Sequence, residues 1–166
     1  GYYTFSISAD ADGPGAKLPT ADDYYESIDF FASMPAGYEG ILEVSPQSAK
    51  SGSNQTIMLT YTLGKDFKEG CIDLNLPKEL AFTVGQDKVT INGVEKTLTE
   101  EDISDDGQRV HVTGITAKKG DKLSMTLYNK TIPAAGSYLF CVEADIDGEK
   151  GKEPKTLGSG REFVAF

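Results

Sequence analysis

The stretch TIMLTYTL, residues 56–63, decides the fold class of this chain. Every second residue in it is apolar, and these are Ile57, Leu59, Tyr61 and Leu63. Such a two-residue period is typical of a β-strand with one face toward a core and the other toward solvent. The stretch therefore predicts a strand of an antiparallel sheet, in which one face is buried and the other is solvated.

The same alternation recurs on both sides of this strand, in short runs separated by turn residues. The runs are 71–76, 89–98, 109–115, 122–129 and 137–146. Asn92-Gly93 and Asp106-Gly107 predict tight turns, because these residue types tolerate positive φ. The segment Thr99–Ile103 allows a single helical turn or a loop. About seven strands at this spacing predict an all-β, antiparallel immunoglobulin-like β-sandwich.

The charge of the chain excludes several classes of partner. There are 26 Asp and Glu residues against 16 Lys and Arg, for a formal net charge of -10. This charge repels phosphate backbones and anionic lipid head groups, so nucleic acid is not expected as a partner. The sequence contains no run that approaches the roughly 20 apolar residues of a spanning helix, so membrane insertion is not expected either.

The two ends of the chain resemble each other. Residues 1–13 (GYYTFSISADADG) align with residues 136–148 (GSYLFCVEADIDG) at a constant offset of 136 − 1 = 135. Continued to residue 31, the alignment holds ten identical positions: Gly1, Tyr3, Phe5, Ala9, Asp10, Asp12, Gly13, Lys17, Pro19 and Phe31, each matched 135 residues later. A period of this size indicates a domain-sized repeat rather than a solenoid.

The repeat suggests how the chain is organised. We expect residues 1–31 to be closing strands that resemble the end of a preceding repeat, and residues 32–166 to form the sandwich. The alternative is that residues 1–31 form an extra hairpin of the same fold. Under the first interpretation, the neighbouring modules of the same protein are the expected partners.

A family resemblance is carried by the stretch Val44–Thr62 and by punctuation further along the chain. The residues that fit it are Ser45, Pro46, Gly52, Ser53, Tyr61, Thr62, Pro77, Gly114 and Gly120. On these residues the chain resembles the Ig-like β-sandwich modules of Gram-positive bacterial surface-layer and cell-wall multidomain proteins. The resemblance implies a location outside the cell, secreted or at the cell surface, and a spacer or adhesive role without catalytic residues.

Catalysis has no support in the sequence. His111 is the sole histidine and alternates with Val110 and Val112, which places it on the polar face of its run. The sequence shows no Ser-His-Asp ordering, phosphate-binding glycine loop or Cys/His metal spacing. Clustered carboxylates in an acidic chain indicate a solvated face. We therefore expect that this protein is not an enzyme.

Two Asp-x-Asp-Gly turns are the candidate metal site. They contain Asp10 and Asp12 in one copy and Asp145 and Asp147 in the other. Alternate carboxylates that leave a strand point to one side, so Ca2+ could bridge them. Neither turn continues as an EF-hand loop, and Asp with Gly is also the ordinary composition of a hairpin end. Calcium binding and a plain turn both stay open.

Cys71 and Cys141 fall on the faces opposite the apolar sets of their runs. If the two strands are neighbours in one sheet, a disulfide on the outer face is one expectation, and an exported protein would permit it. Two separate thiols are the alternative. Ser6 stands at the position equivalent to Cys141 in the other repeat, which argues against an obligatory bond.

The tyrosines raise carbohydrate binding as a second function. Sugars stack on aromatic rings, and Tyr24, Tyr25 and Tyr38 could form such a platform, although the chain has no tryptophan. The favoured function is a noncatalytic adhesive or spacer module of a repetitive extracellular bacterial surface protein. The alternative is a carbohydrate-binding module of a secreted polysaccharide-degrading enzyme. Cell-wall or plant polysaccharide, or another surface protein, would then be a partner.

Overall fold

The computed structural model describes residues 2–8, 25–31, 40–146 and 156–166. The chain divides into two compact units, Gly1–Ala36 and Gly37–Phe166. The predicted boundary after residue 31, and the origin of residues 1–31 as the end of a repeat, stay predictions. Among the described residues, no helix has the length and apolar character that a membrane span requires.

The first unit contains one antiparallel pair of strands. β1 (Tyr2–Ser8) pairs with β2 (Tyr25–Phe31). Tyr2 lies opposite Phe31, and Ser8 lies opposite Tyr25. Both strands are unbroken in register, so the pair is a regular two-stranded ribbon.

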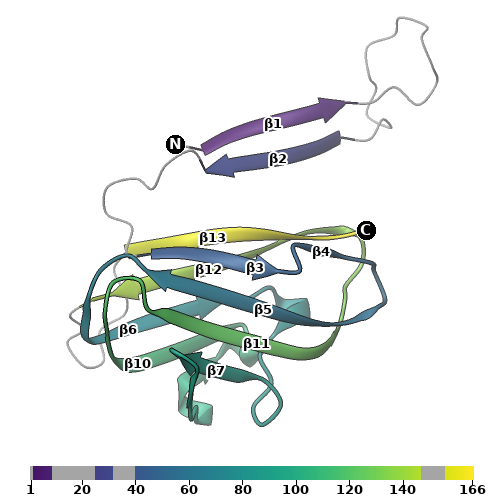
Figure 1. Ribbon diagram of the computed structural model, residues 1–166. Helices are drawn as coiled ribbons and strands as arrows, with labels where there is room; N and C mark the ends of the chain where they lie inside the picture. Colours follow the sequence, from purple (N-terminus) through teal and green to yellow (C-terminus); the bar gives the residue numbers. More distant parts are fainter. Residues whose placement is uncertain (1, 9–24, 32–39, 147–155) are drawn as a thin grey trace, which may run out of the picture. The chain divides into compact units, whose positions relative to one another are not determined.

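The second unit consists of two sheets packed face to face (Figure 1). The six-stranded sheet has the order β4 (Ser48–Ala49), β13 (Thr156–Ala165), β12 (Gly136–Asp145), β6 (Phe67–Asn75), β10 (Arg109–Ala117), β9 (Ile103–Ser104). The five-stranded sheet has the order β3 (Gly40–Ser45), β5 (Asn54–Leu63), β11 (Lys122–Thr131), β7 (Lys88–Ile91), β8 (Val94–Lys96). All pairings in both sheets are antiparallel except that of β13 with β4.

The prediction of an all-β fold of two mostly antiparallel sheets is confirmed, but the strand count of about seven is wrong. The described part of the second unit has eleven strands, β3 to β13. The two-residue strands β4 and β9 are too short to show a period. β13 shows no alternation because glycine and serine interrupt it, so its pairing with β12 rather than its own pattern makes it a strand.

The core lies between the two sheets and is built from the alternating residues that the sequence singled out. From the five-stranded sheet it takes Ile57, Leu59, Tyr61, Leu63, Leu123, Met125 and Leu127, all buried. From the six-stranded sheet it takes Ile72, Leu74, Val110, Val112, Phe140, Val142 and Ala144, also buried. Burial of each large apolar side chain contributes about 1.5–3 kcal/mol relative to exposure, so these faces drive the packing of the two sheets.

The predicted turns are present. Asn92 and Gly93 connect β7 to β8 with φ of 51° and 79°, and Asp106 and Gly107 precede β10 with φ of 54° and 85°. Glu100–Asp102 forms a single 3-10 turn that begins with a capping box between Thr99 and Asp102. Val94, which directly follows the first of these turns, is 72% exposed.

Candidate functional site: an apolar patch on the β12–β13 edge

An apolar patch lies on the outer face of the β12–β13 hairpin. It consists of Leu139, Val164 and Phe166, whose exposed fractions are 57%, 45% and 67%. Leu139 lies opposite Glu162 and Val164 lies opposite Ser137, so Leu139 and Val164 are diagonal neighbours on one face. Burial alternates at the end of the chain, where Phe163 and Ala165 are buried and Val164 and Phe166 are exposed, so Phe166 lies on the same face as Val164. We call these three residues the edge patch.

Backbone hydrogen bonds fix the edge patch in place. The N–H of Val164 donates to the carbonyl of Gln47 at 3.0 Å, and the N–H of Phe166 donates to that of Ala49 at 3.2 Å. The carbonyl of Phe166 accepts from the N–H of Ser51 at 2.8 Å. The patch is therefore displayed on a strand tied down on both sides, not on a loose end.

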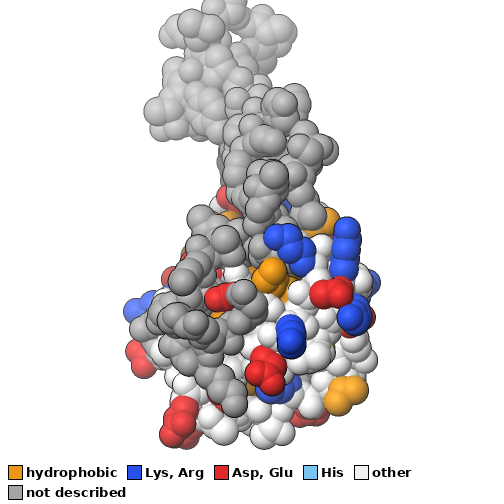
Figure 2. All heavy atoms as spheres, turned by 90° about the vertical axis from the view of Figure 1, so that its left-hand side faces the viewer, with side chains coloured by type: hydrophobic (Ala, Val, Ile, Leu, Met, Phe, Trp, Pro, Cys, Tyr) orange, Lys and Arg blue, Asp and Glu red, His pale blue; other side chains and the backbone are white. Residues whose placement is uncertain are grey.

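The other large apolar side chains that the structure shows exposed do not share this hairpin. They are Ile41, Met58, Val84 and Val94, in β3, in β5, in the loop before β7 and at the start of β8. Figure 2 shows one side of the molecule, on which hydrophobic side chains form small separate groups among acidic and basic ones. Single exposed apolar residues are ordinary, whereas several on one face suggest contact with a partner or an interface.

A buried ionic cluster lies on the outer face of the same six-stranded sheet. The side chain of Asp73 is fully buried, and the guanidinium of Arg109 donates to its carboxylate, with Nε at 3.0 Å. The Nδ1 atom of His111 contacts the other carboxylate oxygen. His111 is therefore on the outer face, as predicted, but it covers a buried carboxylate instead of standing alone in solvent. Among the described residues this cluster contains no nucleophile, and it ties β6 to β10.

Cys71 and Cys141 lie on neighbouring strands of one sheet, as the disulfide hypothesis required, but neither is in a disulfide. Cys141 lies opposite Asn75, whereas Cys71 lies opposite Asp145. Four residues of strand separate the two positions, about 13 Å, and a disulfide spans Cα atoms at most about 7 Å apart. This register favours two separate thiols, which is the second of the two alternatives that the sequence left open.

Both thiols are protonated at neutral pH. Burial, with smaller contributions from Asp145 and Asp73, raises the pKa of Cys71 to about 11. Burial and then the charge of Glu143 raise the pKa of Cys141. Because the thiolate is the nucleophile and the metal ligand, neither cysteine is set up for reaction.

Most of the predicted metal and sugar residues lie outside the described residues. These are Asp10, Asp12, Asp147, Tyr24 and Tyr38. Asp145 ends β12 opposite Cys71, and the backbone of Tyr25 begins β2. Within the described ranges, no three His, Cys, Asp or Glu side chains are grouped to hold a metal. Calcium binding at the Asp-x-Asp-Gly turns stays a prediction.

The sequence contained a signal for part of the edge patch. In the run 137–146, alternation places Tyr138, Phe140, Val142 and Ala144 on one face, which leaves Leu139 as a large apolar residue on the other face. That misplaced leucine could have been noticed. Val164 and Phe166 could not, because β13 has no alternation from which to infer a face.

The second unit is thus a two-sheet β-sandwich whose exterior displays an apolar patch held in place by backbone hydrogen bonds. The family Biofilm surface layer A (BslA) matches residues 42–162, and the chain belongs to this family. A search of curated proteins gave no match.

Two solved structures show what the fold is similar to. The crystal structure of BslA, titled a bacterial hydrophobin, is 25% identical and has a TM-score of 0.55 over 75% of this chain and 96% of that chain. AvmM, titled as catalysing macrocyclization in alchivemycin A biosynthesis, is 7% identical with a TM-score of 0.35 over 76% and 88% of the two chains.

The family assignment corrects two predictions and confirms one. The resemblance to Ig-like modules of surface-layer and cell-wall proteins is wrong, because glycine, proline and threonine punctuation is common to many sandwiches. The adhesive or spacer module and its carbohydrate-binding alternative are overturned with it. The extracellular location, secreted or at the cell surface, is confirmed.

Proposed function

We propose that this chain is a noncatalytic component of a biofilm surface layer and that it gathers at an interface through the edge patch. The family and the hydrophobin title of the matched structure support this proposal. The observation that carries it is the exposure of Leu139, Val164 and Phe166 on one tied-down face. The partners are an apolar interface and other copies of the chain. We also propose that the sandwich is immunoglobulin-like.

The edge patch has the physical properties that adsorption needs. Transfer of apolar surface out of water is favourable by about 25 cal/mol per Å², whether the apolar phase is protein, oil or air. Three side chains therefore give a modest gain for each molecule, which suits a protein that must stay dispersed before it reaches an interface. Because the backbone of the edge is already ordered, adsorption does not have to order it first.

Replacement of the edge patch by charge should abolish most of the surface activity. We expect the double variant Leu139→Lys, Val164→Lys to lower the surface tension of water much more slowly than the parent chain, because a lysine must be desolvated at the interface. The measurement is dynamic surface tension by pendant drop at equal protein concentration. Circular dichroism and thermal melting establish that the variant is folded.

Val94→Lys is the matched control for this experiment. Val94 is exposed like the patch residues, but it lies beyond the β7–β8 turn in the other sheet. A lysine there leaves the edge patch intact and changes the formal charge only to -10 + 1 = -9, so the adsorption of this variant should stay close to that of the parent chain. Equal loss in both variants, or no loss in the patch variant, would show that adsorption does not depend on the edge patch.

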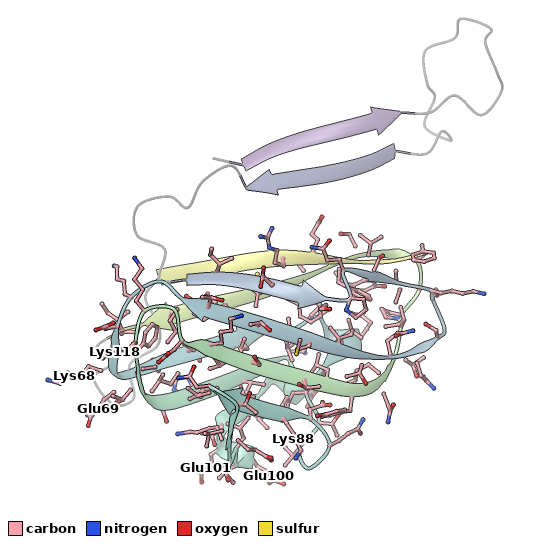
Figure 3. All side chains as sticks on the ribbon, viewed as in Figure 1. Lys68, Glu69, Lys88, Glu100, Glu101 and Lys118 are labelled. Carbon is pink, nitrogen blue, oxygen red and sulfur yellow. The ribbon has the colours of Figure 1, made fainter. Side chains whose placement is uncertain are left out.

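Adsorption should also be faster at higher ionic strength. Each chain carries a formal charge of -10, and the labelled charged side chains in Figure 3 point away from the sandwich. Copies crowded into a layer repel each other until salt reduces the screening length to about 8 Å near 0.15 M. We expect film formation to be slow near 0.01 M salt and fast near 0.15 M.

Two exposed single substitutions test the charge argument. Lys68→Glu changes the formal charge to -10 − 2 = -12 and should steepen the salt dependence. Glu101→Lys changes it to -10 + 2 = -8 and should weaken the dependence. Adsorption rates that do not change with salt, or that change equally in both variants, would contradict the repulsion.

A further inference from the structure

The first strand pair corresponds to the last hairpin of the sandwich. β1 shifted by the repeat offset of 135 becomes 137–143, which lies inside β12. β1 pairs antiparallel with the next strand along the chain, as β12 does with β13. Tyr3 lies opposite Phe30, and the equivalent Tyr138 lies opposite Phe163. At the constant offset of 135, however, Phe30 corresponds to Ala165, so the two hairpins pair in registers that differ by two residues. The structural resemblance is therefore limited to the bounds of β1 and to its antiparallel pairing with the following strand.

The positions that match best are those that face the core in β12. Phe140 and Val142 are buried in the sandwich, and Phe5 and Ile7 stand at the equivalent positions. Tyr3 and Tyr138 are also identical. Phe140 packs edge-on against Phe163, with ring centroids 6.5 Å apart. The residue types of β1 at these positions are thus those required beside β6.

The alternate positions have changed instead. Leu139, Cys141 and Glu143 on the outer face of β12 correspond to Thr4, Ser6 and Ser8. A repeat that had lost its packing role would be expected to drift on both faces. Within β1 the retained residues are the core-facing ones, which indicates that β1 is suited to pack on a sandwich of this kind. The next alternate position, Asp10, is again identical to its equivalent Asp145.

β12 is held in the sandwich because it pairs with β6 and buries Phe140 and Val142 in the core. The sequence of β1–β2 fits that same position, but each sandwich has one such position, and its own β12–β13 fills it. The two hairpins of a chain are therefore alternative occupants of one place.

We propose that the β1–β2 hairpin of one copy takes the place of β12–β13 beside β6 in a second copy. In this exchange, the hairpin of one copy would occupy the position of an equivalent hairpin in the next copy. Such a contact is heterologous, because the two copies contribute different surfaces, and it therefore links copies into open rows. The exchange does not rest on the edge patch or on adsorption. It competes with the resident hairpin, so the linked form is the minor one until the resident hairpin is weakened.

An engineered disulfide tests the exchange in the full chain. In the pairing of β12 with β6, Cys141 lies opposite Asn75, and Ser6 is the residue of β1 that is equivalent to Cys141. The chain Ser6→Cys, Asn75→Cys in a Cys71→Ala, Cys141→Ala background should form a bond between residues 6 and 75 of different copies, because directly opposite strand residues are within disulfide reach. Mixed isotope-labelled and unlabelled chains, oxidised together and mapped by mass spectrometry, separate links between copies from links within one chain.

Three controls decide the outcome. The first control carries Asn75→Cys and Cys71→Ala and retains Cys141. A disulfide between residues 75 and 141 should form within one chain, which would show that the sandwich folds in the observed register. The second control carries Tyr2→Cys in place of Ser6→Cys. Residue 2 is four positions away from residue 6 along the strand, so few disulfides between residues 2 and 75 should form. In the test chain, Val142→Ala should raise the linked fraction severalfold, and its equivalent Ile7→Ala should lower it severalfold.

Opposite effects of these two alanine substitutions cannot come from random collision of cysteines. A link between residues 6 and 75 of different copies that follows this pattern supports the exchange. Absence of that link, a link confined to one chain, or equal links from residues 2 and 6 overturns it.

Discussion

Asp73→Ala is expected to lower the free energy of unfolding by about 3 kcal/mol, although the residue lies on the outer face of its sheet. The Asp73 carboxylate is fully buried and accepts from Arg109 on the neighbouring strand β10. His111, two residues along β10, contacts its other oxygen. Removal of the carboxylate leaves two polar side chains against a gap. Both retain partial access to water, which keeps the loss at the lower end for a broken buried pair.

Urea unfolding of Asp73→Ala, Arg109→Ala and the double variant measures the coupling in this cluster. We expect the double variant to lose less than the sum of the two single variants, because each single change already breaks the shared pair. His111→Ala should cost less than either, since Asp73 keeps its partner Arg109. Additive losses would show that the two residues stabilise the sandwich separately.

Alternation was sufficient to predict those strands that bury one face and expose the other. The run 56–63 lies within β5, and its alternating residues Ile57, Leu59, Tyr61 and Leu63 are all buried. The run 71–76 gave the buried Ile72 and Leu74 of β6 in the same way. The physical reason is that the pleat of a strand forces a two-residue period wherever a core lies on one side only.

Long-range pairing could not be predicted from local sequence. β13 is a ten-residue strand without alternation, and it forms because β12 offers a complete edge with which to pair. The edge patch depends on that strand for Val164 and Phe166, so it was hidden as well. Asp73 alternates with Ile72 and Leu74, so the pattern places it on the outer face, but its burial depends on Arg109 and His111 of another strand. Such a cluster becomes visible only when the register of β6 and β10 is known.

The family was misjudged because the residues used for the resemblance are those that any sandwich needs. Gly52, Gly114 and Gly120 have φ of 75°, 64° and 91°, where glycine is favoured whatever the protein does. Turn residues report backbone geometry, and geometry is shared between unrelated families with the same architecture. The proposed function rests on surface residues such as Leu139, for which a single sequence offers little comparison.

Asp87→Ala should have the largest effect on stability, about 4–5 kcal/mol, because it breaks a buried pair and leaves two backbone donors unsatisfied. The Asp87 side chain is fully buried, and that of Lys130 is 11% exposed, with 2.6 Å between Oδ2 and Nζ. The carboxylate also accepts from the N–H groups of Thr83 at 2.7 Å and Tyr128 at 2.8 Å. One side chain thus joins the loop before β7 to β11.

The exposed pair of Lys88 and Glu95 provides the comparison for this prediction. Its N···O distance of 2.9 Å is similar, but both side chains are about half exposed. Glu95→Ala should therefore cost at most about 1 kcal/mol. Thermal and urea unfolding of the two alanine variants measure the contrast, and Asp87→Asn should fall between them because its single carbonyl oxygen can replace only part of the network. Similar losses for Asp87→Ala and Glu95→Ala would mean that burial does not set the strength of these pairs, and that the loop before β7 is held by its backbone hydrogen bonds instead.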